Sequence, residues 1–591
     1  MRFENVPYFY LNFFVHLQRR EFYLSQTFAT RRSHIYSPHK IMFIDARTLP
    51  ENTFIECDIC IIGAGAAGIT LARELIDQPL QVCLLESGGL EFDEVTQSLY
   101  AGENVGEPYY SLAEARARYL GGSTNFWGGW SRPLDDIDFQ ERPWMPYSGW
   151  AFNKAQLDPY YDRAQTACNL GAYKYDFADW EDALKQRQLL PVPTSGDSLV
   201  TQVWQTIPST HLRFGEAYRE QIEQARNIDT YLHANVVEIV TNDTACSVTK
   251  LRVTNNAGKE FWIAAKVFVL ASGGIENPRL LLNSRQVQNT GLGNQHDLVG
   301  RFFMEHPILN SGKVQFPHYT NLYSRKDVPV DGALLSTGLG LSSQVQEREQ
   351  LLNFTIRFNS FLPEGLEALK RLSFRLQQTK NPDALQTILK DHRKIPQTSV
   401  MEDVATVVGN LDAVIAKAYT KFFSKKLNAL KAANICSTRL ISEQAPNPDS
   451  RITLSSDRDK LGLNKVKLDW RLSEIDRYTM QRSQQIIASE LNGFAQNELT
   501  DNNIAWQSLR GSYHHMGTTR MSTNPRLGVV NEHCQVHGIN NLYIAGSSVF
   551  PTSGLSNPTL TIIALSIRLG DRLKTRLGGS VGYVSNFVTI P

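Results

Sequence analysis

Short apolar runs alternate with glycine-rich turns and helical segments near the start of the chain. The run over 56–62 predicts a buried strand, and the run over 81–85 predicts a second one. Between them lie a turn, 63–68, and a segment, 69–76, with the apolar spacing of a helix. This order predicts a β-turn-α-β unit of the length that binds a dinucleotide.

The same two patterns return along the rest of the chain. They predict strands over 231–240, 247–254, 260–263, 267–271, 451–454, 465–470 and 541–545, and helices over 276–283, 473–491 and 558–577. The middle, 363–426, has a largely helical, amphipathic pattern with breaks at Pro382 and Pro396. We therefore expect an α/β fold with α+β character overall.

Composition narrows the class of protein. The chain has 591 residues, enough for two lobes, with 42% apolar and 20% charged residues, as in globular proteins in water. Lys and Arg number 60 against 59 Asp and Glu, a balance that argues against nucleic acid as a partner. No apolar stretch approaches the roughly 20 residues that span a bilayer, so we expect no membrane span.

The seven cysteines are sparse and odd in number, which argues against a disulfide framework. Cys57 and Cys60 have the spacing of a redox or metal motif. They lie inside the first predicted strand, however, and we interpret them as ordinary strand thiols. We expect no metal site and a reducing, cytoplasmic compartment.

Residues 1–41 differ in composition from the rest of the chain. They are rich in Phe, Tyr and Arg and have no periodic pattern that predicts a packed element. Arg19 and Arg20 resemble a twin-arginine export signal, but no apolar core comes after them, so we do not interpret them as one. We expect a loose extension, or a start placed ahead of the native one, with Met42 just before the ordered chain.

The turn after the first strand has the residues that a pyrophosphate requires. Gly63 permits the tight turn, Gly65 lets a pyrophosphate approach the backbone, and Gly68 lets the helix pack on the strand. The free N–H groups at the helix start would then face the phosphates. An acidic residue, Glu86, ends the second strand, where it can bind a ribose hydroxyl. NAD and FAD both use this unit, so the motif leaves the dinucleotide open.

Three later groups of residues resemble one family. They are GGST at 121–124 with WGG at 127–129 and RP at 132–133, SGGIENPR at 272–279, and GSYHHMGT at 511–518 with NLYIAGSSVFPTSGLSNPTLT at 541–561. In this order they resemble the flavin loop, the second dinucleotide turn and the C-terminal signature of the glucose–methanol–choline (GMC) oxidoreductases. The loop and the middle of the chain look most similar to the pyranose-oxidase, fructose- and gluconate-dehydrogenase side of that family.

The resemblance implies FAD as cofactor and a discontinuous, Rossmann-like FAD-binding domain with a substrate domain built on an antiparallel sheet. We place the FAD-binding domain at 42–310 with 505–591, and the substrate domain at 311–504. The segment 505–591 would carry the catalytic residues. The cofactor would contact Gly63, Gly65, Ala66, Ala67, Gly68, Glu86, Gly121, Gly122, Ser123, Asn125, Trp127, Gly128, Val237, Gly273, Gly546, Ser547, Asn557, Pro558 and Thr559.

Two residues are candidates for the chemistry. A neutral imidazole suits the removal of a hydroxyl proton near pH 7. His514 stands three residues before Gly517, where the family has its catalytic histidine, and Asn557 comes 43 residues later, where the family has its His or Asn partner. His515 competes with His514, but neighbours in an extended segment face opposite ways, and the spacing from Gly517 favours His514.

Other details of these motifs bear on the cofactor and the substrate. Some family members attach FAD through a histidine in this loop, whereas Asn125 stands at that position here, so we expect non-covalent FAD. We interpret Glu-His-Pro at 305–307 as structural. The tryptophans Trp127, Trp130 and Trp144 could shape a sugar-binding surface or pack in the core.

The sequence thus predicts an FAD-dependent enzyme that oxidises a CH–OH group of a sugar, polyol or other alcohol. A GMC-fold lyase or another non-oxidising flavoprotein is the alternative. The partners we expect are a small alcohol and a separate electron acceptor, either a quinone, a dye-like molecule or a protein, or else oxygen. We favour a dehydrogenase over an oxidase.

Overall fold

The computed structural model describes residues 43–186, 194, 196–316, 328–360, 368–369, 372, 400–409, 435–499 and 504–578. The chain divides into two units, 1–40 and 41–591, and every described residue belongs to the second. The prediction of a loose N-terminal extension therefore lies outside the described residues.

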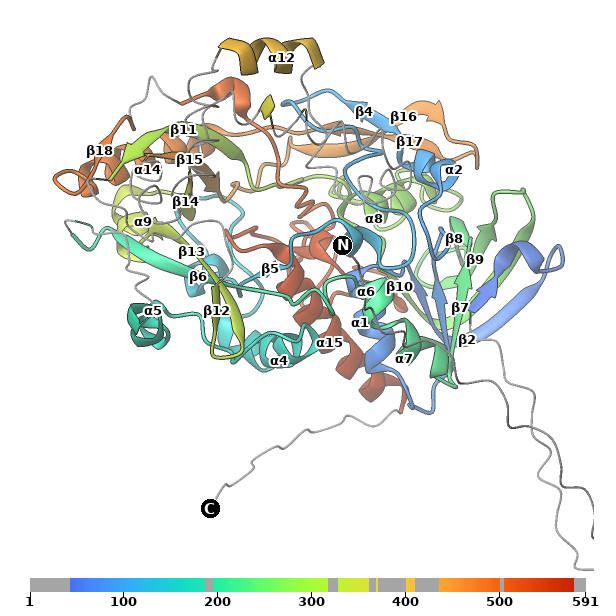
Figure 1. Cartoon of the computed structure of the whole chain (residues 1–591). Helices are drawn as coiled ribbons and strands as arrows, with labels where there is room; N and C mark the ends of the chain where they lie inside the picture. The colour runs from blue at the N-terminus through green and yellow to red at the C-terminus, as the bar shows by residue number, and fades with distance from the viewer. Residues whose placement is uncertain are drawn as a thin grey trace, which may run out of the picture. The chain divides into compact units, whose positions relative to one another are not determined.

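One large sheet is mostly parallel and carries the predicted dinucleotide unit (Figure 1). Its order is β1-β7-β3-β2-β10-β9-β8, with β19 beside β10. The strands are β1 (Phe43–Asp45), β2 (Phe54–Ile62), β3 (Val82–Leu85), β7 (Ile228–Leu232), β8 (Asn235–Thr241), β9 (Val248–Thr254), β10 (Glu260–Leu270) and β19 (Leu542–Ile544). All pairs are parallel except β10-β9 and β9-β8.

The predicted β-turn-α-β unit is present as β2, α1 (Ala66–Glu74) and β3. The last residues of β2 and all of β3 are buried, as the apolar runs predict. The sheet also takes β19 from the C-terminal part of the chain, and α15 (Pro558–Leu577) packs against α1. The Rossmann-like domain is therefore discontinuous, as predicted.

A second large sheet is antiparallel throughout, as predicted for the other half of the fold. Its order is β18-β11-β15-β14-β13-β6-β5, with β12 beside β13. The strands are β5 (Trp130–Ser131), β6 (Leu199–Thr206), β11 (Ile308–Gln315), β12 (Val328–Val330), β13 (Ala333–Leu341), β14 (Phe354–Ser360), β15 (Ile435–Ser442) and β18 (Gln496–Asn497). Two of its strands, β5 and β6, come from before residue 310, where we placed the boundary of the substrate domain. The domain bounds stay a prediction.

Helix α14 (Glu474–Glu490) lies against β14 and β15 of the second sheet. Its Met480 and Ile487 join a buried cluster with Ile356 and Leu440 from those strands. A small third sheet pairs β16 (Arg451–Arg458), β17 (Asn464–Asp469) and β4 (Gly102–Asn104). Within the described ranges, the remaining α-helices are α2 (Glu94–Gln97), α3 (Asp136–Phe139), α4 (Lys154–Ala167), α5 (Glu181–Gln186), α6 (Phe214–Ala217), α7 (Arg219–Gln224), α8 (Gly273–Asn283), α9 (Ser343–Glu349) and α12 (Val400–Gly409).

Two predicted strand boundaries are wrong. The run over 231–240 forms two strands, β7 and β8, because His233 takes a left-handed conformation with φ 58° between them. The runs over 260–263 and 267–271 form one strand, β10, which continues through Ala264, Ala265 and Lys266 between them. Most of the predicted helical region 363–426 lies outside the described residues, and α12 is the helix described there.

The structure also bears on two features of the sequence, the possible membrane span and the cysteines. Among the described residues, no helix is both long and apolar enough to cross a membrane. The seven cysteines, all within the described ranges, are free thiols; Cys57 is half-buried and Cys60 is buried on β2.

Candidate active site

The two residues predicted to carry the chemistry lie together at the start of α15. Asn557 is the residue before Pro558, at the N-cap of the helix, and its side chain makes no capping bond there. Its amide Nδ2 lies 3.3 Å from Nε2 of His514. Both residues are half-buried. A helix start carries partial positive charge. An anion would therefore be favoured at this place, beside the imidazole and the amide donor.

A second histidine, His306, contacts His514 through the ring nitrogen that does not face Asn557. Its Nδ1 lies 2.9 Å from Nδ1 of His514, and its Nε2 lies 2.8 Å from the carbonyl oxygen of Gly554. The two rings stand edge to face, with centroids 4.9 Å apart. The interpretation of 305–307 as structural stays a prediction, and the structure adds that His306 lies against His514. Nothing in the sequence indicates this contact, since 208 residues separate the two histidines.

Glu305 binds the segments that carry the two histidines together. Its carboxylate accepts hydrogen bonds from the backbone N–H of Ser512 at 2.9 Å, of His514 at 3.0 Å and of His306 at 3.1 Å. The hydroxyl of Tyr109 also donates to it. Glu305 is fully buried, and burial raises its pKa to about 6 although these hydrogen bonds act in the opposite direction. The carboxylate thereby fixes the backbone on both sides of the histidine pair.

His515 faces away from His514. Its Nε2 lies 2.8 Å from the hydroxyl oxygen of Tyr109, and its ring lies beside Phe303. The residue before His514, Tyr513, takes a left-handed conformation with φ 63° and stacks on Tyr110 at 4.0 Å. The structure thus brings His514, and not His515, to Asn557.

All three histidines favour the neutral form. Burial lowers the pKa of His306 to about 4 and that of His515 to about 3. Burial, together with the neighbouring His306 and His515, lowers the pKa of His514 well below its ordinary value. A neutral imidazole can accept a proton, so His514 can act as a base at neutral pH.

The predicted glycine turn forms an open cradle at the start of α1. A Cβ on Gly65 would meet nothing closer than the Cα of Gly122, at 3.9 Å. Gly65 is also the N-cap of α1 and, lacking a side chain, leaves the first N–H groups of the helix for another acceptor. By contrast, a Cβ on Gly68 would lie 1.8 Å from the carbonyl oxygen of Gly63. Gly68 is therefore needed by the fold, whereas Gly65 leaves space.

The other predicted cofactor residues fall into two groups. Along the chain, one group lies between the end of β2 and the start of α8, and the other lies between the end of β19 and the first residues of α15. The first holds Gly63, Ala66, Ala67, Gly68, Glu86, Gly121, Gly122, Ser123, Asn125, Trp127, Gly128, Val237 and Gly273; the second holds Gly546, Ser547, Asn557, Pro558 and Thr559. The start of α8 packs closely against the histidine segment, because a Cβ on Gly274 would overlap the backbone of His515.

Several of these side chains have partners within the protein. The Glu86 carboxylate accepts from the N–H of Ala64 at 3.1 Å and of Gly88 at 2.9 Å. The Asn125 amide donates to the carbonyl of Leu120 at 2.9 Å, and the Trp127 indole donates to that of Leu212 at 2.5 Å. Both hold the loop that comes after Gly121.

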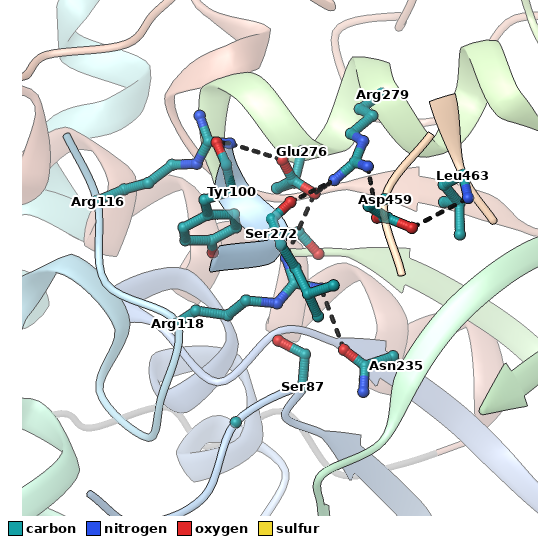
Figure 2. A network of polar contacts seen from close by, with 12 residues as sticks. Ser87, Tyr100, Arg116, Arg118, Asn235, Ser272, Glu276, Arg279, Asp459 and Leu463 are labelled. Atoms are coloured by element: carbon teal, nitrogen blue, oxygen red, sulfur yellow. Dashed lines mark hydrogen bonds and ion pairs between the residues drawn. The ribbon is translucent and has the colours of Figure 1, made fainter. Parts of the chain in front are cut away.

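A buried arginine network beside the cradle was not predicted (Figure 2). Glu276 pairs with Arg116 at 2.8 Å and with Arg279 at 3.1 Å, and Arg279 also pairs with Asp459 at 2.6 Å. Arg118 approaches Glu276 at 3.5 Å. Burial favours the neutral acid, but the three arginines outweigh it and hold the pKa of Glu276 below its ordinary value.

The network leaves donors without acceptors. Nε and Nη1 of Arg116 and Nε of Arg118 are buried with no hydrogen-bond partner among the described residues. Three guanidinium groups share two carboxylates, and Figure 2 shows Ser87, just after β3, and Ser272, just before α8, beside them. Since unpaired buried donors are costly, this arrangement suits an anionic ligand at these strand ends. The sequence signal that could have indicated this network is the pair of arginines just before Gly121.

Comparisons with known proteins agree with this geometry. Residues 446–566 match the family model described as GMC oxidoreductase, and residues 58–290 match that described as FAD dependent oxidoreductase. The chain is 22% identical to the fructose dehydrogenase large subunit of Gluconobacter japonicus, over 88% of this chain and 98% of that protein. It is 24% identical to 6'''-hydroxyparomomycin C oxidase of Streptomyces lividus, over 88% and 92%.

Among solved structures, the chain resembles pyridoxine 4-oxidase from Mesorbium loti. The TM-score is 0.51 at 16% identity, and the match covers 87% of this chain and 99% of that one. This likeness supports the fold alone.

Proposed function

Because this chain is an FAD-dependent oxidoreductase of the GMC family, we propose that it oxidises the CH–OH group of a sugar, polyol or other alcohol with His514 as the base. Relatives named as fructose dehydrogenase large subunit and 2-methyl-1,2-propanediol dehydrogenase support an alcohol as the substrate. The observation that carries the proposal is the contact between His514 and Asn557 at the start of α15.

The residues present fit FAD. The space beside Gly65 and the free N–H groups of α1 suit a diphosphate, and the unpaired donors of Arg116 and Arg118 suit an anion nearby. The second group of residues, at the start of α15, would hold the redox-active end. When bound, FAD supplies the acceptor for the hydride that leaves the alcohol carbon.

The protein's own residues would handle the proton and the developing charge. Nε2 of His514 would accept the hydroxyl proton, and the amide of Asn557 would donate a hydrogen bond to the same oxygen. The partial positive charge at the start of α15 favours the oxygen as it becomes anionic. Asn557 cannot take up that proton itself, so it orients the substrate without competing with His514.

We further propose that FAD is held without a covalent bond. Asn125 stands where a linking histidine would be needed, and its amide is engaged with the carbonyl of Leu120. We also propose that the electron acceptor is a separate quinone, dye-like molecule or protein; two relatives are named dehydrogenases, while 6'''-hydroxyparomomycin C oxidase is named an oxidase. The sparse, odd set of cysteines supports a cytoplasmic location.

Anaerobic reduction of the flavin by a panel of alcohols tests the proposal. At least one sugar or polyol should bleach the flavin of the wild type, and His514→Ala should slow that step by about a hundredfold or more, the scale of a general base. His515→Ala is the matched control and should slow it far less. A wild type that no alcohol reduces would instead favour the alternative, a non-oxidising flavoprotein of this fold.

A further inference from the structure

We propose that His306 is a positioning residue that fixes the tautomer of His514, so that the lone pair of the base lies on Nε2, beside Asn557. This inference rests on the proposed role of His514 as the base. It comes from a chain of hydrogen bonds in which each partner decides the direction of the next.

The chain begins at the carbonyl oxygen of Gly554. A carbonyl oxygen only accepts, so Nε2 of His306, 2.8 Å away, must carry a hydrogen. His306 is only 1% exposed, and burial favours its neutral form. A neutral imidazole with a hydrogen on Nε2 has a lone pair on Nδ1. His306 therefore presents an acceptor to His514.

The hydrogen bond between the two histidines then sets the tautomer of the base. Nδ1 of His514 lies 2.9 Å from Nδ1 of His306, so His514 must donate from Nδ1. Neutral His514 then has its lone pair on Nε2. The amide Nδ2 of Asn557, at 3.3 Å, is a donor and suits that lone pair. The three contacts agree on one tautomer, and the reverse assignment would place two N–H groups against each other at Asn557.

The surroundings hold His306 in place from two sides. On one side, the carboxylate of Glu305 accepts the backbone N–H of His306 and that of His514. On the other side, the N–H of Gly554 donates to Glu443 at 3.1 Å, and Glu443 is paired with Arg142 at 2.6 Å. The charged or titratable groups that face the two histidines are thus Glu305, Glu443 with Arg142, and His515.

The tautomer decides whether the base works at all. With a hydrogen on Nε2, His514 has no lone pair toward Asn557 and cannot take a proton there. In serine proteases, a change that leaves the catalytic histidine in the wrong tautomer lowers kcat by about 10⁴. Losing His306 removes the preference without enforcing the wrong form, so the expected loss is smaller, on the order of tenfold to a hundredfold.

Two variants of His306 separate positioning from packing. His306→Leu removes both hydrogen bonds. His306→Gln can accept from Nδ1 of His514 through its oxygen and donate to Gly554 through its nitrogen. His537→Leu is the matched control, because His537 also contacts a carbonyl, that of Ser522 at 2.9 Å, but lies outside the site.

The first readout is the rate of flavin reduction by a reducing alcohol, measured by rapid mixing across pH. We expect His306→Leu to lower the limiting rate at least tenfold with little change in substrate affinity or bound FAD. His306→Gln should recover most of that loss, and His537→Leu should match the wild type. A His306→Leu rate within about twofold of the wild type overturns the inference. If no alcohol reduces the wild type, the proposed function fails instead.

The second readout needs no turnover and no His306 variant. In protein labelled with ¹⁵N-histidine, the nitrogen resonances of His514, assigned by their loss in His514→Ala, report which nitrogen carries the hydrogen. We expect a protonated Nδ1 and an unprotonated Nε2 at neutral pH. The opposite pattern overturns the inference even if His306→Leu does not fold.

Discussion

The contrast between Gly65 and Gly68 gives a sharp test of how this chain binds its cofactor. Both glycines belong to the same turn, but the structure assigns them different roles. A Cβ on Gly65 would meet only the Cα of Gly122, at 3.9 Å, which is ordinary contact. A Cβ on Gly68 would lie 1.8 Å from the carbonyl oxygen of Gly63, an overlap that the backbone cannot avoid without moving.

The expected magnitudes come from these distances. Gly65→Ala should change the stability of the cofactor-free protein by no more than about 1 kcal/mol, since Ala is a poorer N-cap than Gly but meets no clash. It should weaken FAD binding, because the methyl group would occupy the space that the diphosphate needs. Gly68→Ala should destabilise the protein by about 3 kcal/mol or more, at the upper end for an overpacked site.

Thermal unfolding with and without added FAD measures both effects. For the wild type, FAD at about a hundred times its Kd should add about 2.7 kcal/mol of stability. Gly65→Ala should unfold like cofactor-free wild type and lose most of this increase, and it should purify with little flavin. Gly68→Ala should unfold early or accumulate as insoluble protein. The reasoning is refuted if Gly65→Ala keeps the full response to FAD, or if Gly68→Ala is as stable as the wild type.

Three further predictions concern the cofactor bond, acid stability and the electron acceptor. Acid precipitation should release the yellow flavin into the supernatant, because Asn125 cannot form a covalent link; colour in the pellet contradicts this. The pKa of buried His306 is lowered from 6.5 to about 4, so the folded state binds fewer protons than the unfolded state and loses stability as pH falls from 6.5 towards 4. His306→Gln should therefore lose about 2 kcal/mol less between pH 7.5 and 5.0 in urea unfolding, and an unchanged pH dependence argues against it. With whichever alcohol reduces the flavin, turnover should be faster with a quinone or dye than with air-level oxygen; stoichiometric hydrogen peroxide at a comparable rate would point to an oxidase.

The parts of the fold that local pattern determines could be predicted. The β2-α1-β3 unit, α8, α14 and α15 all have the apolar spacing of their elements, and Asn557-Pro558 predicts the start of α15 within one residue. The antiparallel sheet could be expected only from the family resemblance. Its strands β13 and β15 combine apolar, small and polar residues without regular alternation, so their pattern indicates neither a strand nor a partner.

Some residues of the candidate site could also be predicted from local pattern, and others could not. His514 and Asn557 could be found because each lies in a stretch with its own signature, and the structure places them in contact. His306 and Glu305 could not, since their contacts with this segment depend on pairing between residues 304–308 and the segment before Gly517, which no local spacing encodes. The partners of Arg116 and Arg118 were equally hidden, because Glu276 lies about 160 residues away.

The pairing between residues 304–308 and the segment before Gly517 has a consequence for protein engineering. Backbone bridges join Met304 to Met516 and Ile308 to Arg510, so the loop that carries the proposed base, His514, is held by the start of β11 and the residues just before it. Exchanging substrate-binding halves between relatives is a natural way to transfer specificity. A crossover that takes 304–308 from one parent and 510–516 from another would pair segments that did not evolve together, and we expect it to shift His514 even when His514 and Asn557 are both kept. Both stretches must therefore come from the same parent for a chimera to remain active.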